Sequence, residues 1–147
     1  MFKKSLWIPV LAFCVAILGF KGPEGGEGFE IYMSGKLVMQ QFGNQMNTVK
    51  SLTIDKSSYN AELSVKYYHC GQAGKNRAIL IKDDQNKILK EWRFGDGVNA
   101  MSCNVKDIVD LKKDNATLNL YYSSKELPAG RKLVSINTRT TGVTARL

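Results

Sequence analysis

The sequence is poor in the residues and motifs that mark most catalytic and metal-binding sites. Its 147 residues include one histidine and three cysteines, and they show neither C-x-x-C nor H-x-x-x-H, the spacings that make a zinc site specific. The glycines form neither G-x-x-x-x-G-K-[ST] nor G-x-G-x-x-G, so they predict turns rather than a phosphate-binding loop. We therefore expect no cofactor and no metal.

Long runs of basic residues are also missing, although the net charge is +8. A nucleic-acid-binding protein concentrates basic residues in a stripe with interleaved aromatics. Here single lysines alternate along strand-like segments, a pattern that solvated strand faces explain and that discourages aggregation between strand edges. We expect no nucleic-acid partner, whereas weak attraction to acidic glycans or to an anionic envelope surface agrees with the charge.

The one long apolar run lies at the N-terminus, where Lys3 and Lys4 precede Leu6–Phe20. A short positive region followed by an apolar region predicts a signal peptide, residues 1–20, with Gly19 before the best available cut. The protein is then secreted or periplasmic.

Two alternatives would keep the N-terminal segment on the protein. The apolar run is shorter than the about 20 residues that a spanning helix needs, which argues against a retained membrane anchor. The bulky Phe13 directly before Cys14 argues against a lipoprotein. Glycine-rich residues 21–28 predict a flexible leader, and residues 29–147 give room for one domain. A membrane partner is expected only if the N-terminal segment is retained.

The domain shows short segments of period-two alternation separated by turn residues, which is typical of β-strands. Ser34 and Gly35 predict a two-residue hairpin turn, and only Asn104–Asp114 has helical spacing. The pattern predicts an all-β protein, a single antiparallel β-sandwich of about eight strands, either immunoglobulin-like or jelly-roll-like. The expected strands are Phe29–Met33, Lys36–Phe42, Val49–Asp55, Ala61–His69, Arg77–Asp84, Lys87–Phe94, Thr117–Ser124 and Arg131–Thr138.

His69 and Cys70 are consecutive in an expected strand, so their side chains point to opposite faces. His69 falls in line with Leu63, Val65 and Tyr67 on the core-facing side. This alternation predicts a hydrogen-bonded histidine in the core or at its rim.

Without the first twenty residues the chain keeps two cysteines, Cys70 and Cys103. In an oxidising compartment two cysteines predict a disulfide, which would stabilise the fold by about 3 to 4 kcal/mol. Both lie at ends of elements, so we expect them at one end of the sandwich. The alternatives are free buried thiols, a thiol nucleophile in which His69 activates Cys103, and a zinc site formed by His69, Cys70 and Cys103.

Aromatic residues are abundant for a small β domain. Tyr68 and Tyr121 lie opposite the apolar stripes of their strands, and with Trp92 they are the candidate binding residues. Exposed rings, with hydrogen bonds from the amide-rich loop Gln40–Asn47, would form a platform for a sugar or a protein. The competing interpretation is that aromatics simply favour strands and half-bury there.

The segments IYMSGKLVMQQ, YYHCG, RAILIKDDQNKILKEWRF and LYYSSKELPAG carry a resemblance to small secreted β-sandwich proteins of unknown function of the Bacteroidota type. The resemblance spans Phe29 to Thr138 and rests on overall pattern. It implies a secreted or envelope location and no presumption of catalysis, and it carries over no functional residue.

The sequence as a whole favours a non-enzymatic secreted or periplasmic module that binds another envelope protein. A carbohydrate-binding module that uses the exposed rings is the alternative. An enzyme would require a pocket that holds His69 beside Cys103 or an acidic group.

Overall fold

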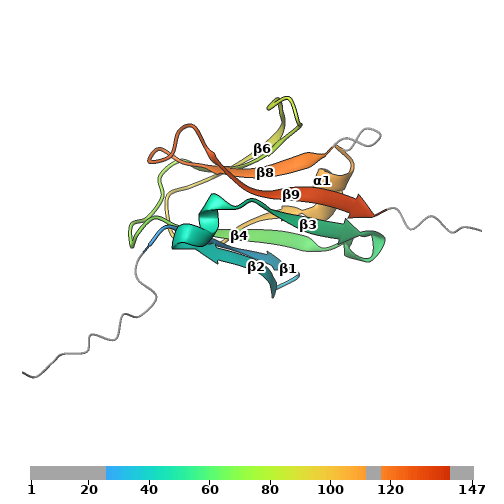
Figure 1. Cartoon of the computed structure of the whole chain (residues 1–147), viewed down its shortest axis with the longest axis horizontal. Coiled ribbons are helices and arrows are strands. Elements are labelled where there is room, and N and C mark those ends of the chain that lie inside the picture. Colours follow the sequence, from blue (N-terminus) through green and yellow to red (C-terminus); the bar gives the residue numbers. More distant parts are fainter. Residues whose placement is uncertain (1–25, 112–116, 140–147) are drawn as a thin grey trace, which may run out of the picture.

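The computed structural model describes residues 26–111 and 117–139, which form a sandwich of two β-sheets (Figure 1). This confirms the predicted all-β sandwich. The predicted signal peptide (residues 1–20) lies outside the described residues. The sandwich begins earlier than expected, because Gly28, assigned to the leader, is the first residue of a strand.

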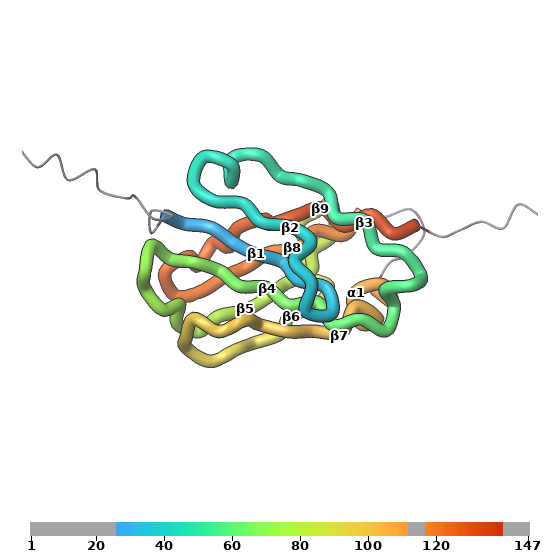
Figure 2. Tube along the Cα trace, turned by 90° about the horizontal axis from the view of Figure 1, so that it is seen from below, coloured from blue at the N-terminus to red at the C-terminus, as the bar shows by residue number. Residues whose placement is uncertain are grey.

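Sheet A has four antiparallel strands in the order β2-β1-β4-β7 (Figure 2). Ser34 and Gly35 have positive φ angles of 48° and 79°, and they connect the first two strands as the hairpin turn predicted from the sequence. The strands are β1 (Gly28–Met33), β2 (Lys36–Phe42), β4 (Glu62–Tyr68) and β7 (Met101–Asn104).

Sheet B has five strands in the order β3-β9-β8-β5-β6. All its pairs are antiparallel except β3 with β9, which is parallel. The chain leaves sheet A after β2, passes through the 3-10 helix η1 (Gly43–Asn47), and joins sheet B beside the last strand. The strands are β3 (Lys50–Asp55), β5 (Arg77–Lys82), β6 (Ile88–Phe94), β8 (Leu118–Ser123) and β9 (Arg131–Arg139).

All eight predicted strands are present, with ends within two residues of those expected. The ninth, β7, has four residues and was missed because so short a segment shows no clear alternation. It leads directly into α1 (Val105–Val109), which is shorter than the predicted helical segment.

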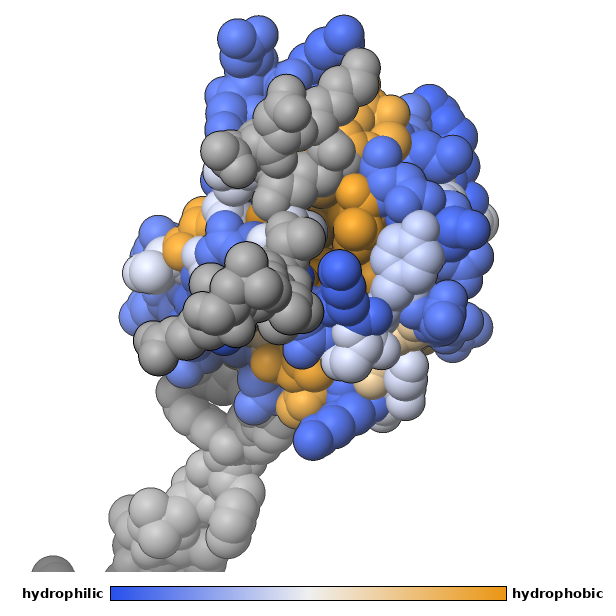
Figure 3. All heavy atoms as spheres, turned by 90° about the vertical axis from the view of Figure 1, so that its right-hand side faces the viewer, coloured by the Kyte–Doolittle hydropathy of each residue, from blue (hydrophilic) through white to orange (hydrophobic). Residues whose placement is uncertain are grey.

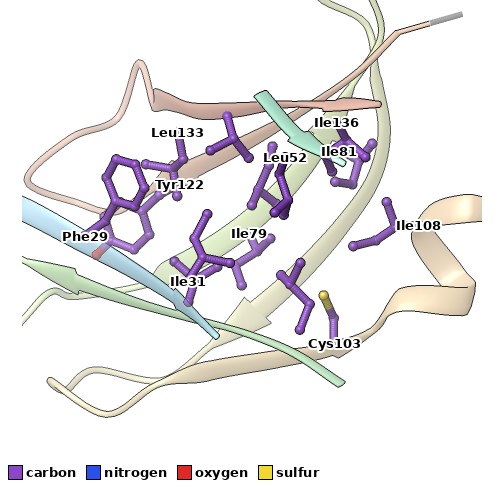
Figure 4. Packing of buried hydrophobic residues seen from close by; sticks show 14 of the residues in the cluster. Phe29, Ile31, Leu52, Ile79, Ile81, Cys103, Ile108, Tyr122, Leu133 and Ile136 are labelled. Carbon is purple, nitrogen blue, oxygen red and sulfur yellow. The ribbon is translucent and has the colours of Figure 1, made fainter. Parts of the chain in front are cut away.

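Side chains from both sheets fill the space between them (Figure 4). In β4 the alternation is regular, with Leu63, Val65 and Tyr67 buried and the residues between them partly exposed. Each strand therefore has an inner face towards the core and an outer face towards solvent. At the α1 end of the sandwich, hydrophobic residues are visible between hydrophilic ones (Figure 3).

Four strands form the edges of the sandwich, β2 and β7 in sheet A and β3 and β6 in sheet B. Edge strands matter for function because one side of their backbone has no neighbouring strand. No helix within residues 26–111 and 117–139 is long and apolar enough to cross a membrane.

Candidate functional site

His69 lies just after β4, at the rim of the core. Its Nε2 is 2.8 Å from the Tyr122 hydroxyl and 3.4 Å from Ser124 Oγ. Its ring is tilted against those of Tyr67 and Tyr122, with centroids 4.8 and 5.4 Å away. The prediction of a hydrogen-bonded rim histidine is confirmed.

The two tyrosines beside His69 connect the sheets. Tyr67 of β4 stacks on Tyr122 of β8 with centroids 4.1 Å apart, and burial raises the pKa of both hydroxyls. The Tyr67 hydroxyl donates to Glu27, which also forms an ion pair of 3.0 Å with Arg131. Glu27 therefore attaches the start of β1 to both sheets, although the sequence assigned it to a flexible leader.

The predicted disulfide between Cys70 and Cys103 is wrong, because both cysteines are free. Cys103 in β7 pairs with Leu63 at the beginning of β4, whereas Cys70 follows the other end of the same strand. Seven residues of extended chain separate those ends by roughly 20 Å, and a disulfide needs Cα atoms within about 7 Å. The two cysteines lie at opposite ends of the sandwich.

The same separation removes the thiol nucleophile and the zinc site proposed from the sequence. His69 contacts Tyr122, whereas Cys103 lies near Ile108 at the far end of the core (Figure 4). Burial also raises the pKa of the Cys103 thiol to about 12, which suppresses the thiolate that a nucleophile requires.

An acidic group does lie near His69. The Glu126 carboxylate accepts a hydrogen bond from the Lys75 N–H at 3.1 Å, which lowers its pKa to about 2, and it interacts electrostatically with His69. The two surface hollows described below are lined by other residues.

The three candidate binding rings do not form one platform. Tyr68 alternates with buried Tyr67, so it lies on the outer face of sheet A. Tyr121 lies on the outer face of sheet B between two buried residues, and Lys82 Nζ is 4.3 Å from its ring centroid.

Trp92 lies on a third face. It pairs with buried Ile79, which in turn pairs with buried Tyr122, so all three belong to the inner face of sheet B. Its ring is partly buried and packs against the core. The prediction that Tyr68, Tyr121 and Trp92 together form a binding platform is therefore wrong.

Tyr68 instead belongs to a group on the outer face of sheet A. Its ring centroid is 5.5 Å from that of Phe42. Glu30 accepts hydrogen bonds of 2.8 Å from both Tyr68 and Tyr32. The Phe42 ring covers Gly28 so closely that a Cβ there would lie 2.0 Å from a ring carbon. Beside Tyr32 the surface forms a shallow hollow of about 380 Å³, lined by Tyr32, Gly35, Ser64, Lys66, Val98, Asn99 and Ala100.

The open backbone edge of β2 is the second feature of sheet A. The Gly43 N–H donates to the Glu27 carbonyl at 3.0 Å, and hydrogen-bonded and non-hydrogen-bonded pairs alternate along an antiparallel ladder. Gln40 and Glu30 form the third pair beyond Gly43 and Glu27 in this ladder. By the alternation they are therefore a pair that exchanges no backbone hydrogen bonds. Gln40 directs both its N–H and its carbonyl away from β1, to the open side.

Two amide side chains of the predicted hydrogen-bonding loop, those of Gln41 and Gln45, stabilise this turn. Gln41 Nε2 donates to the carbonyls of Gln45 and Thr48, at 2.9 and 3.0 Å. The Phe42 N–H donates to Gln45 Oε1 at 3.3 Å. These bonds fold the chain back over the Phe42 end of β2 and leave the other part of its edge open.

The side chains along this edge are uncharged from Leu37 to Phe42. Leu37 is 43% exposed, Val38 40% and the neighbouring Val49 45%. Between the β2 edge and the start of β3 lies a hollow of about 390 Å³, which we call the β2 groove, lined by Leu37, Val38, Met39, Gln40 and Lys50.

The other edges are protected. The edge β6 carries Lys90, Glu91 and Arg93, and β3 begins with Lys50 and ends with Asp55. Strand β7 has four residues and continues directly into α1. Because charges and short length discourage strand pairing, β2 is the described edge most open to a further strand, although a register shift at Val38 interrupts its ladder with β1. The uncharged run LVMQQF was the sequence signal for it, but it identifies an edge only once the strand order is known.

Comparisons with known proteins add no relative, since no family model matches the chain and no curated protein sequence does so either.

Proposed function

We propose that this protein is an exported, non-enzymatic module that binds another protein of the cell envelope through the β2 groove. The observation that carries the proposal is the edge itself, an open strand whose side chains from Leu37 to Phe42 bear no charge. Natural proteins protect such edges unless they use them, because an open edge recruits other strands.

The strand order supports an immunoglobulin-like sandwich rather than a jelly roll. Strands β9, β8, β5 and β6 are adjacent in the order that G, F, C and C′ have in variable-type immunoglobulin domains. Strands β4 and β7 pair in the opposite sheet, as B and E do there. Many cell-surface domains have this architecture and bind through their edges and loops.

Export is supported by the n-region and h-region of residues 1–20. A non-enzymatic role is supported by the distance between His69 and Cys103, since they lie at opposite ends of the sandwich. The His69 ring is hydrogen-bonded to the Tyr122 hydroxyl instead. The aliphatic residues of the β2 groove offer contact surface without a reactive group.

Photo-cross-linking from the β2 groove tests the proposal. A photoreactive residue in place of Val38 is expected to give one discrete cross-linked product with an envelope protein in the native cells. The matched control replaces Ile88, which is 50% exposed on the opposite edge strand β6, and should give none. Equal products from both positions, or none from Val38, would contradict the proposal.

The hollow beside Tyr32 supports a second candidate, a carbohydrate-binding module. It brings a tyrosine ring next to the hydroxyl of Ser64, the amide of Asn99 and the charge of Lys66, which are the stacking and hydrogen-bonding groups that sugars use. If this function holds, a glycan array should show binding that Tyr32→Ala and Tyr68→Ala both weaken. Binding unchanged in both variants would eliminate it.

A further inference from the structure

We propose that the β2 groove takes an extended, acidic segment of its partner as an additional strand of sheet A. This inference rests on the proposed function and specifies the partner's local structure and charge. The inference rests on three properties of the groove: the direction of its backbone groups, its exposed aliphatic side chains and its two lysines.

The backbone provides the first argument. Gln40 directs its N–H and carbonyl away from β1, and in an antiparallel ladder these are the groups with which a next strand pairs. The Phe42 end is closed by Gln45, whose side chain accepts the Phe42 N–H. The open length therefore runs from Leu37 to Gln40, and because the register shifts at Val38 it can pair only with a short extended segment.

The side chains provide the second argument. Leu37 and Val38 are two-fifths exposed, and Met39 is partly buried against the core. Leu37 and Val38 are consecutive, and the register of β1 with β2 shifts at Val38, so a strand added at this edge would cover them with side chains from both of its faces. The occupant is therefore expected to carry aliphatic or β-branched residues on both faces.

Charge provides the third argument and identifies the occupant. Lys36 begins β2 and Lys50 lines the groove, while the carboxylate on adjacent β1, Glu30, accepts bonds from two tyrosines. A carboxylate on the incoming strand would complement these lysines. A second copy of this chain carries the same net charge of +8, so two copies repel one another, whereas an acidic segment is attracted.

The probe for the test is a library of random nine-residue peptides displayed on phage and selected against the purified full chain. Selected sequences should be rich in aliphatic or β-branched residues and contain Asp or Glu. Gln40→Pro removes the outward N–H without breaking the ladder to β1, because proline is tolerated where an edge N–H faces solvent. This variant should weaken a selected peptide at least about tenfold, through the lost bond and the hindered approach.

Charge reversal tests the second half of the inference. Lys50→Glu should weaken the selected acidic peptide about threefold or more, the range of an exposed ion pair. Lys90→Glu makes the same charge change on the opposite edge and should leave binding unchanged. Circular dichroism and urea midpoints establish that each variant is folded.

Three outcomes would overturn the inference. The first is peptide binding that Gln40→Pro leaves intact. The second is enrichment of basic or neutral peptides. The third is a concentration-dependent dimer of the full chain that Gln40→Pro abolishes, because the occupant would then be a second copy. A discrete cross-link from Val38 together with binding insensitive to Gln40→Pro would reject strand addition and leave the interaction module standing. Loss of the Val38 cross-link would instead reject the module.

Discussion

At the scale of single residues, Gly28 shows how one missing side chain arranges a surface. The Phe42 ring occupies the space that a Cβ at Gly28 would need, and from there it contacts Tyr68. The glycine thus lets an aromatic ring lie flat over β1 at the covered end of β2. The aromatic group on the outer face of sheet A depends on this contact.

Replacing this glycine should be costly. In Gly28→Ala the Phe42 ring must leave its position, which is expected to lower the free energy of unfolding by about 1 to 3 kcal/mol. Gly95→Ala is the matched control, because a Cβ there meets nothing within 4 Å, and it should change stability by no more than about 0.5 kcal/mol. Urea denaturation measures both. Equal costs in the two variants would show that Phe42 does not rest on Gly28.

Sequence alternation predicted some candidate residues and failed for others for a local reason. It placed His69 on the core side of β4 and Tyr68 on the opposite side, as the structure shows. Trp92 could have been assigned correctly as well, because Glu91 and Arg93 occupy the opposite face of β6. Its selection as a binding ring followed its residue type rather than its position in the strand.

At the scale of elements, the two ends of β4 explain the failed disulfide. Strand positions were predictable because alternation is a local property. The pairing of Cys103 with Leu63, by contrast, depends on β7, a strand too short to detect, packing antiparallel to β4. The parallel pair of β3 with β9 was unpredictable for the same reason, since the partner of a strand is set by contacts distant in the sequence.

The positions of the two thiols predict their reactivity. Cys70 is exposed and should react rapidly with iodoacetamide in the native protein at pH 8, whereas Cys103 is buried with its pKa raised to about 12 and should react only after unfolding. Mass spectrometry of tryptic peptides identifies each site. Two native thiols that resist alkylation until they are reduced would contradict this assignment and restore the disulfide.

At the scale of the whole molecule, a basic sandwich leaves one uncharged edge open. Within residues 26–111 and 117–139, three of the five exposed large hydrophobic residues lie on the side where β2 and β3 form edges, namely Leu37, Val38 and Val49. The histidine lies at the rim of the core and Cys103 is buried in it. The β2 groove, rather than these residues, is therefore the binding surface that we propose.

Amide hydrogen exchange of Gln40, read against that of Gln41, tests the central claim that this edge is open and is the binding surface. In the free protein the Gln40 amide should exchange rapidly, because it points away from β1, while the Gln41 amide, which faces Phe29 in the ladder, should exchange slowly. Binding of a selected acidic peptide should then protect Gln40. A Gln40 amide already protected in the free protein, or one still exchanging rapidly in the complex, would contradict the account.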